Sequence, residues 1–212
     1  MTDKPGTSDT SIEFASLLCS RLCHDMLSPI GALNNGLELL ADETDPAMRA
    51  QCMELLADSA RVSADKLKFF RLAFGAAGGF GDTIAADETR TGIEALVKGN
   101  GRIVFGWLVD EAELSRGATR LLLNMSLIAI DALVRGGRLD VGVENGEIVV
   151  RAEGARLVLD EGIRTVLAGG EAALSSRIIC ASLIQAIAAG EGRSVLLSES
   201  DGVLLLGASA PA

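Results

Sequence analysis

Residues 21–40 read RLCHDMLSPIGALNNGLELL, and their pattern sets the fold of the N-terminal third of the chain. Apolar side chains recur at helical spacing through this stretch and just before it. They are Leu18, Leu22, Met26, Ile30, Leu33, Leu37 and Leu40. Pro29 and Gly31 lie inside this stretch and disfavour a regular helix. The pattern predicts one long amphipathic helix over residues 12–42, after a disordered segment at residues 1–11.

A second helix is expected after a tight turn at residues 42–46, which read DETDP. Asp45 is a suitable N-cap, and Pro46 suits the first helical position. The helix continues to about Gly75 with an apolar face of its own. The two helices form an antiparallel hairpin that, with its connection, occupies residues 12–76. Because two helices cannot enclose a core, we expect the hairpin to dimerise into a four-helix bundle.

A glycine-rich linker, GAAGGFG at residues 75–81, precedes a second domain at residues 83–212. The patterns there predict helices at 89–98, 115–134, 159–167 and 175–189, and strands at 102–109, 139–144, 147–152, 194–198 and 203–206. Two hairpin turns are indicated by Asn145-Gly146 and Asp201-Gly202. The predicted class is therefore α+β, a helical hairpin followed by an α/β sandwich.

The charge of the chain excludes several kinds of partner. The formal net charge is −10 and aromatic residues make up only 3% of the chain. An acidic chain lacks the basic face that binds nucleic acid or an anionic membrane. The polar N-terminus has no signal-peptide pattern, and no apolar run is long enough to span a bilayer. We therefore expect a cytoplasmic protein without nucleic-acid or membrane partners.

His24 is the only histidine in the chain. At about 100° per residue, it lies roughly 200° around the helix from Leu22, the centre of the apolar stripe. Its ring should therefore point to solvent. A neutral imidazole is a competent nucleophile, and Asp25 is placed to hydrogen-bond it. His24 and Asp25 are the predicted catalytic pair, and Pro29 should leave the carbonyl of Asp25 without its intrahelical donor.

Two other interpretations of His24 stay open. A lone histidine on a helix surface is more often idle than functional. A zinc site formed with Cys19 and Cys23 is less favoured, because both cysteines project toward the apolar side of the helix. We expect these two, together with Cys52 and Cys180, to be reduced and buried. No metal and no cofactor are predicted for this chain.

Residues 21–40 resemble the phospho-acceptor box of two-component histidine kinases, in which a histidine, an acidic residue and a proline lie on a dimerising helix. Those residues here are His24, Asp25 and Pro29. The sequence is more similar to the ChpT-like histidine phosphotransferases of alphaproteobacterial phosphorelays. Their corresponding segment also reads Leu-Cys-His-Asp followed by Ser-Pro. The end of the second predicted helix, FFRLAFGAAG at residues 69–78, resembles the same family.

The second domain resembles a kinase ATP-binding domain that has lost its nucleotide site. Residues 123–133 resemble the asparagine box, but Ile128 stands where a kinase carries its magnesium ligand, and a hydrocarbon cannot coordinate magnesium. Ala152 and Arg156 replace the ends of the Asp-x-Gly-x-Gly motif. A Gly-Leu-Gly phosphate loop is also missing. The resemblance implies a degenerate ATPase-like domain that does not bind ATP.

By this resemblance, the protein relays a phosphoryl group between aspartates of response-regulator receivers, including the receiver of a hybrid histidine kinase. The receiver would supply Mg²⁺ and most of the catalytic groups. Arg21 and Ser28, one turn on either side of His24, would meet the phosphoryl oxygens. The residues expected to contact a receiver are Leu27, Gly31, Asn34 and Asn35, with Phe69 or Arg71 as additions.

Two alternative functions stay open beside this one. One is a sensor-kinase core that autophosphorylates with ATP, and Ile128, Ala152 and Arg156 count against it. The other is a dimeric adaptor whose His24 is never phosphorylated.

Overall fold

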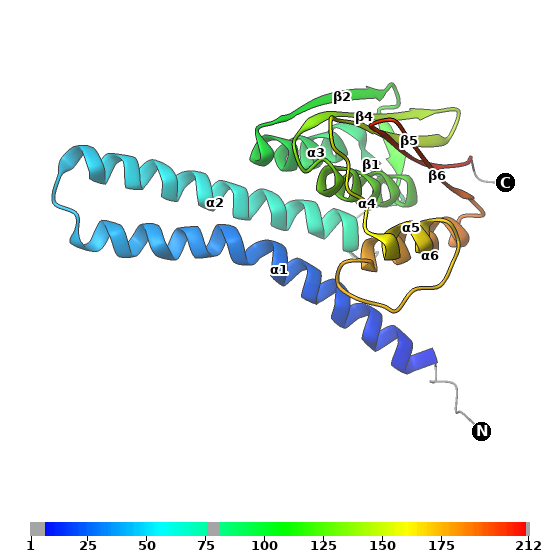
Figure 1. Cartoon of the computed structure of the whole chain (residues 1–212), viewed down its shortest axis with the longest axis horizontal. Helices are drawn as coiled ribbons and strands as arrows, with labels where there is room; N and C mark the ends of the chain where they lie inside the picture. Colours follow the sequence, from blue (N-terminus) through cyan, green and yellow to red (C-terminus); the bar gives the residue numbers. More distant parts are fainter. Residues whose placement is uncertain (1–6, 76–80, 211–212) are drawn as a thin grey trace.

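The computed structural model describes residues 7–75 and 81–210, and its N-terminal part is a long helical hairpin (Figure 1). Helix α1 spans Thr7–Asp42 and α2 spans Pro46–Phe74. The carboxylate of Asp45 accepts a hydrogen bond from the backbone N–H of Ala47, and Pro46 occupies the first turn, as predicted. Asp45 and Pro46 therefore predicted the start of the second helix correctly.

The start of α1 differs from the prediction. Residues 7–11 are helical rather than disordered, because adding residues to an existing helix requires no new nucleation. Residues 1–6 lie outside the described residues, as do residues 76–80 of the predicted linker.

The C-terminal part contains a five-stranded sheet in the order β2-β4-β5-β7-β6. Strands β2 and β4 are parallel, and the other neighbours are antiparallel. The sheet strands are β2 (Ile103–Val109), β4 (Gly137–Glu144), β5 (Glu147–Glu153), β6 (Val195–Ser200) and β7 (Val203–Ala208). The helices are α3 (Ala86–Asn100), α4 (Arg116–Ala132), α5 (Glu161–Leu167) and α6 (Ile179–Gly190). This arrangement confirms the predicted α+β class.

The sequence did not predict a second, two-stranded sheet. Strands β1 (Thr83–Ala85) and β3 (Glu113–Ser115) pair antiparallel. Three residues are too few to show an alternating pattern, so such strands are recognised only from their partner. Both predicted hairpin turns are present, and all four of their residues have positive φ: Asn145, Gly146, Asp201 and Gly202.

The helices cover one face of the sheet and leave the other face to solvent (Figure 1). Along β5, Ile148, Val150 and Ala152 are buried against the helices, whereas Val149 between them is exposed. Helix α4 lies at the centre of the core, with Leu121, Leu122, Leu123 and Met125 fully buried.

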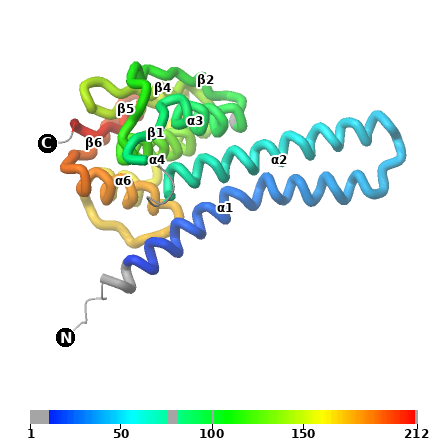
Figure 2. The backbone as a smooth tube through the Cα atoms, turned by 180° about the vertical axis from the view of Figure 1, so that it is seen from behind, coloured from blue at the N-terminus to red at the C-terminus, as the bar shows by residue number. Residues whose placement is uncertain are grey.

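The hairpin packs on this domain at its base and projects beyond it at its tip (Figure 2). Phe69 and Phe70 near the end of α2 belong to the core of the C-terminal domain. The side-chain amide of Asn124 on α4 donates a hydrogen bond of 3.1 Å to the carbonyl of Ala73 at the end of α2. Helix α1 contacts both α6 and α2, with its N-terminal half beside α6 and its C-terminal half beside α2 (Figures 1 and 2). Residues midway along α1 therefore lie where the two domains meet.

Helix α1 changes direction about midway along its length in both views (Figures 1 and 2). Pro29 lies inside the helix, and a proline bends a helix because it lacks the N–H for the carbonyl one turn back.

None of the helices in residues 7–75 and 81–210 is long and apolar enough to cross a membrane.

Candidate functional site

His24 lies midway along α1 and points to solvent, as its position on the helical wheel predicted. Its side chain is 79% exposed. An imidazole with this exposure can be reached by a reactive group carried on another protein.

Asp25 is the direct partner of the His24 ring. Nδ1 of His24 lies 3.1 Å from Oδ1 of Asp25, whose side chain is only 15% exposed. A carboxylate can only accept a hydrogen bond, so in the neutral ring this contact favours the tautomer that carries its proton on Nδ1. The lone pair of Nε2 is then free. The structure therefore brings together the two residues that the sequence paired, and the ring that carries Nε2 is largely exposed.

Arg21 holds the other oxygen of Asp25. Its Nε donates a hydrogen bond of 2.7 Å to Oδ2 of Asp25, and its Nη2 donates one of 2.7 Å to Oδ2 of Asp131 on α4. Burial lowers the pKa of the Arg21 guanidinium, but attraction and hydrogen bonding to Asp131, with attraction to Asp25, raise it above its ordinary value. Arg21 therefore stays charged.

This geometry corrects the expected place of Arg21. The sequence put it on the open surface beside His24, facing the phosphoryl oxygens, whereas its side chain is 13% exposed and both ends of its guanidinium are engaged. The helical wheel gives the direction of Cβ only, and a long side chain reaches well beyond it toward a charged partner.

The carbonyl of Asp25 receives its hydrogen bond from outside α1. Pro29 has no N–H to donate to it, as the sequence predicted. Lys66 on α2 takes that role, since its Nζ donates a hydrogen bond of 2.9 Å to this oxygen. Asp25 is therefore fixed through its main chain by α2 and through its side chain by Arg21.

Most of the residues predicted to contact a receiver lie on α1 near His24. Leu27, Ser28, Asn34 and Asn35 are exposed, and Gly31 is partly exposed. A Cβ added to Gly31 would meet no atom within 4 Å. The surface beside His24 is therefore open.

The two additions predicted on α2 are placed differently. Phe69 is fully buried in the core, so it offers no surface to a partner and that prediction is wrong. Arg71 is exposed but lies toward α3, where its Nη2 is 3.7 Å from Oε1 of Glu88. Both outcomes follow from the C-terminal domain packing on this end of α2, which periodicity within one helix does not reveal.

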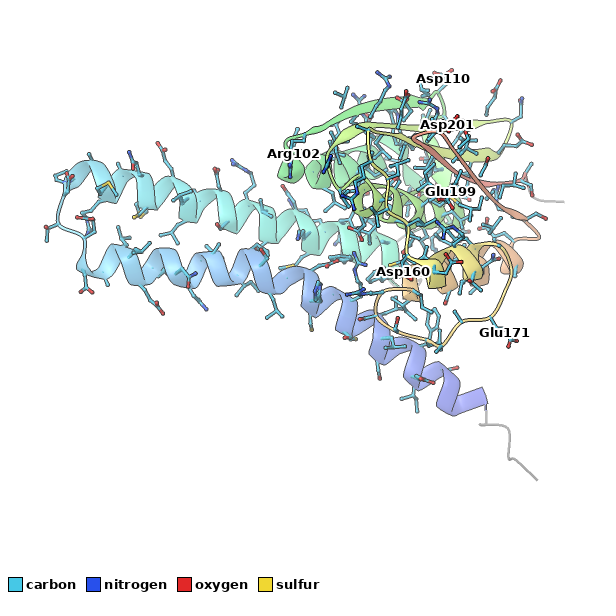
Figure 3. The ribbon with its side chains drawn as sticks, in the orientation of Figure 1. Arg102, Asp110, Asp160, Glu171, Glu199 and Asp201 are labelled. Carbon is cyan, nitrogen blue, oxygen red and sulfur yellow. The ribbon has the colours of Figure 1, made fainter. Side chains whose placement is uncertain are left out.

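A cleft of about 540 Å³ lies beside the site, between the hairpin and the C-terminal domain. Among its lining residues are Arg21, Asp25, Lys66, Arg102, Leu127 and Asp131. Figure 3 shows Arg102 at the edge of the C-terminal domain nearest the hairpin. The site thus has an open side at His24 and a side walled by charged groups.

The sequence missed Lys66 and Asp131. Pro29 signals that the carbonyl of Asp25 needs a donor, but nothing local identifies which one. Asp131 is 110 positions from Arg21. Contacts over such separations leave no trace in periodicity or spacing.

The cysteines are only partly as expected. Cys52 and Cys180 are buried, whereas Cys19 and Cys23 are exposed, because neither α2 nor the C-terminal domain covers their side of α1. Burial raises the pKa of the Cys180 thiol to about 12. Within the described residues, no group of three or more histidine, cysteine, aspartate or glutamate side chains is arranged to hold a metal ion.

The family model described as histidine phosphotransferase C-terminal domain matches residues 86–202, which is more than half of the chain. The chain therefore belongs to the histidine phosphotransferase family, and the resemblance drawn from residues 21–40 is confirmed.

Among the known proteins that are similar to it are two phosphotransferases. Over 142 residues the chain is 39% identical to the protein phosphotransferase ChpT of Brucella abortus (strain 2308), and this covers 65% of the chain and 64% of that relative. A solved structure described as "1.7 Angstrom Structure of a Bacterial Phosphotransferase" has a TM-score of 0.81 at 29% identity, covering 99% of this chain and 98% of that one.

Proposed function

We propose that this protein is a phosphorelay intermediate. His24 accepts a phosphoryl group from an aspartyl phosphate on one response-regulator receiver, such as that of a hybrid histidine kinase, and passes it to an aspartate on another. The observation that carries this proposal is the contact of His24 with Asp25, which occupies Nδ1 and leaves Nε2 exposed. Membership of the histidine phosphotransferase family supports it.

The transfer requires little chemistry from this chain. The Nε2 lone pair attacks phosphorus, the bond from phosphorus to the acyl oxygen breaks, and the receiver aspartate leaves as a carboxylate. The ring keeps its proton on Nδ1 and becomes positively charged, and the Asp25 carboxylate stabilises that charge. Phosphoryl transfer depends chiefly on position and on electrostatic stabilisation, and the receiver with its Mg²⁺ supplies the latter.

The absence of ATP binding is part of the proposal. Ile128 and Ala152 are buried in the core, and their hydrocarbon side chains can neither coordinate magnesium nor accept a hydrogen bond from adenine. Calorimetry at millimolar ATP should show no saturable binding. Saturable binding would favour the sensor-kinase alternative.

A homodimer is also part of the proposal, and an uncovered face of the hairpin supports it. Two rows of exposed side chains follow alternating spacings of three and four residues, the pattern of helices that pack in bundles. The row on α1 is Cys23, Leu27, Ile30, Asn34, Leu37 and Ala41, and the row on α2 is Ala50, Met53, Ala57, Ala60, Ala64 and Leu67.

The two rows share one face of the hairpin. Each lies about 100° around its helix from the residues that pack on the other helix, in the same rotational sense, and the helices are antiparallel. A second copy packed on this face would complete a four-helix bundle. Leu27 and Asn34 would then contact the partner copy, so the receiver would meet mainly Ser28, Gly31 and Asn35 beside His24.

One experiment separates the proposal from its alternatives. The purified chain is incubated first with labelled ATP and then, separately, with a receiver labelled on its aspartate. A relay protein takes label only from the receiver and passes it to a second receiver. A sensor kinase takes label from ATP, and an adaptor takes none from either.

A further inference from the structure

The guanidinium of Arg21 is shared between two carboxylates from different domains. Its Nε binds Oδ2 of Asp25 on its own helix, and its Nη2 binds Oδ2 of Asp131 on α4, both at 2.7 Å. The other oxygen of Asp25 contacts Nδ1 of His24 at 3.1 Å. An unbroken series of contacts therefore joins the C-terminal domain to the ring of His24.

The sharing of Arg21 between two carboxylates determines which oxygen of Asp25 is available to the His24 ring. A guanidinium pairs most favourably with a single carboxylate by donating two parallel N–H groups to both of its oxygens. Arg21 is nearly buried, so it needs a full set of partners. While Asp131 engages Nη2, Arg21 takes only one oxygen of Asp25. Without Asp131, the guanidinium would be free to turn toward Asp25 and bind both of its oxygens, so Oδ1 would no longer be reserved for the imidazole and its contact with Nδ1 would weaken.

We infer that Asp131 is a positioning residue for His24. It acts through Arg21 to keep Oδ1 of Asp25 on Nδ1, which keeps Nε2 unprotonated and facing the receiver. The C-terminal domain, which resembles a kinase domain without its nucleotide site, thus retains a task in phosphotransfer. The inference rests on the proposed function for its effect on rate, but the tautomer of His24 is a property of the free protein.

The test compares Asp131→Ala and Asp131→Asn with wild type in the full-length chain. Because His24 is the only histidine, the ¹⁵N signals of its ring report its tautomer without assignment work. We expect both variants to shift the ring away from the Nδ1–H tautomer and to slow transfer from a phosphorylated receiver by about ten-fold, as a misplaced reacting group does. Asp110→Ala is the matched control, because Asp110 is exposed on the far side of the domain (Figure 3).

The Arg21→Gln background distinguishes two roles of Asp131. In one, Asp131 positions the His24 ring through Arg21; in the other, it only holds the two domains together. If Asp131 acts through Arg21, then Asp131→Ala changes neither tautomer nor rate once Arg21 is replaced. The same loss in both backgrounds would overturn the inference, as would a wild-type tautomer in Asp131→Ala. If wild-type His24 takes no phosphoryl group at all, the proposed function fails, and the tautomer measurement alone decides the inference.

Discussion

Lys66 on α2 donates a hydrogen bond of 2.9 Å to the carbonyl of Asp25, the carbonyl that Pro29 leaves without an intrahelical partner. The two helices of the hairpin are thus tied together one residue from His24. The proline does not simply weaken α1. It leaves the carbonyl of Asp25 without an intrahelical donor, and Lys66 of the neighbouring helix donates a hydrogen bond to that carbonyl.

Replacing Lys66 by methionine should lower the free energy of unfolding by about 1–3 kcal/mol, because a half-buried carbonyl loses its donor while the apolar stem is retained. Urea unfolding at fixed protein concentration measures the change. Lys68→Met is the matched control on the same helix. Lys68 is exposed, and its Nζ lies 3.4 Å from Oδ1 of Asp65, a surface pair whose loss should cost below about 0.5 kcal/mol.

Pro29→Ala provides a second check on this bond. It restores an N–H to the carbonyl of Asp25, so Lys66→Met should cost less in that background. Equal losses with and without Pro29 would show that Lys66 stabilises the hairpin in some other way.

Gly31→Leu should slow transfer from a phosphorylated receiver by ten-fold or more, because a bulky side chain beside His24 blocks close approach. Folding should not suffer, since a Cβ at Gly31 meets nothing within 4 Å and glycine is the weaker helix former by up to about 1 kcal/mol. Gly36→Leu should lower the free energy of unfolding, because its Cβ would lie 2.9 Å from Cδ2 of Leu56. A normal transfer rate in Gly31→Leu would place the docking surface elsewhere.

Leu37→Glu should dissociate the proposed dimer, because it puts a charge into the apolar face that the second copy covers. Leu39→Glu is the control: Leu39 is 65% exposed, against 56% for Leu37, but lies on another side of α1, outside the exposed row. Sedimentation should give twice the chain mass of 22.0 kDa for wild type and Leu39→Glu, and 22.0 kDa for Leu37→Glu. A wild-type species of 22.0 kDa at micromolar concentration would refute the dimer.

The Cys180 thiol should make the protein less stable in alkali. Burial raises its pKa from 9.0 to about 12, so above pH 9 the unfolded chain holds fewer protons than the folded one at this site. Its contribution to stability is complete below pH 9 and declines by about 1.4 kcal/mol per pH unit until pH 12. The free energy of unfolding, measured from pH 8 to 10.5, should therefore fall less steeply with pH in Cys180→Ala than in wild type. Identical slopes would show that the thiol is not buried as described.

Elements with a strong local signal could be predicted from the sequence. Asp45 and Pro46 define the start of α2, Asn145-Gly146 defines a hairpin turn, and the helical wheel gives the direction of His24. The remainder depends on tertiary contacts. The burial of Phe69, the exposure of Cys19 and the pairing of β1 with β3 are each set by what packs nearby. The same is true of the site, where His24 and Asp25 are adjacent in sequence but their supports come from α2 and α4.

Locating the transferred phosphoryl group decides whether His24 is its acceptor. Wild type and His24→Gln are incubated with a receiver labelled on its aspartate, and the labelled peptide is identified and treated with acid and with alkali. We expect label only in wild type, on the peptide containing His24, lost in acid and retained in alkali as for a phosphoramidate, with His24→Gln folded but unlabelled. Label that persists in folded His24→Gln, or that is stable in acid and lost in alkali, would contradict the relay through His24.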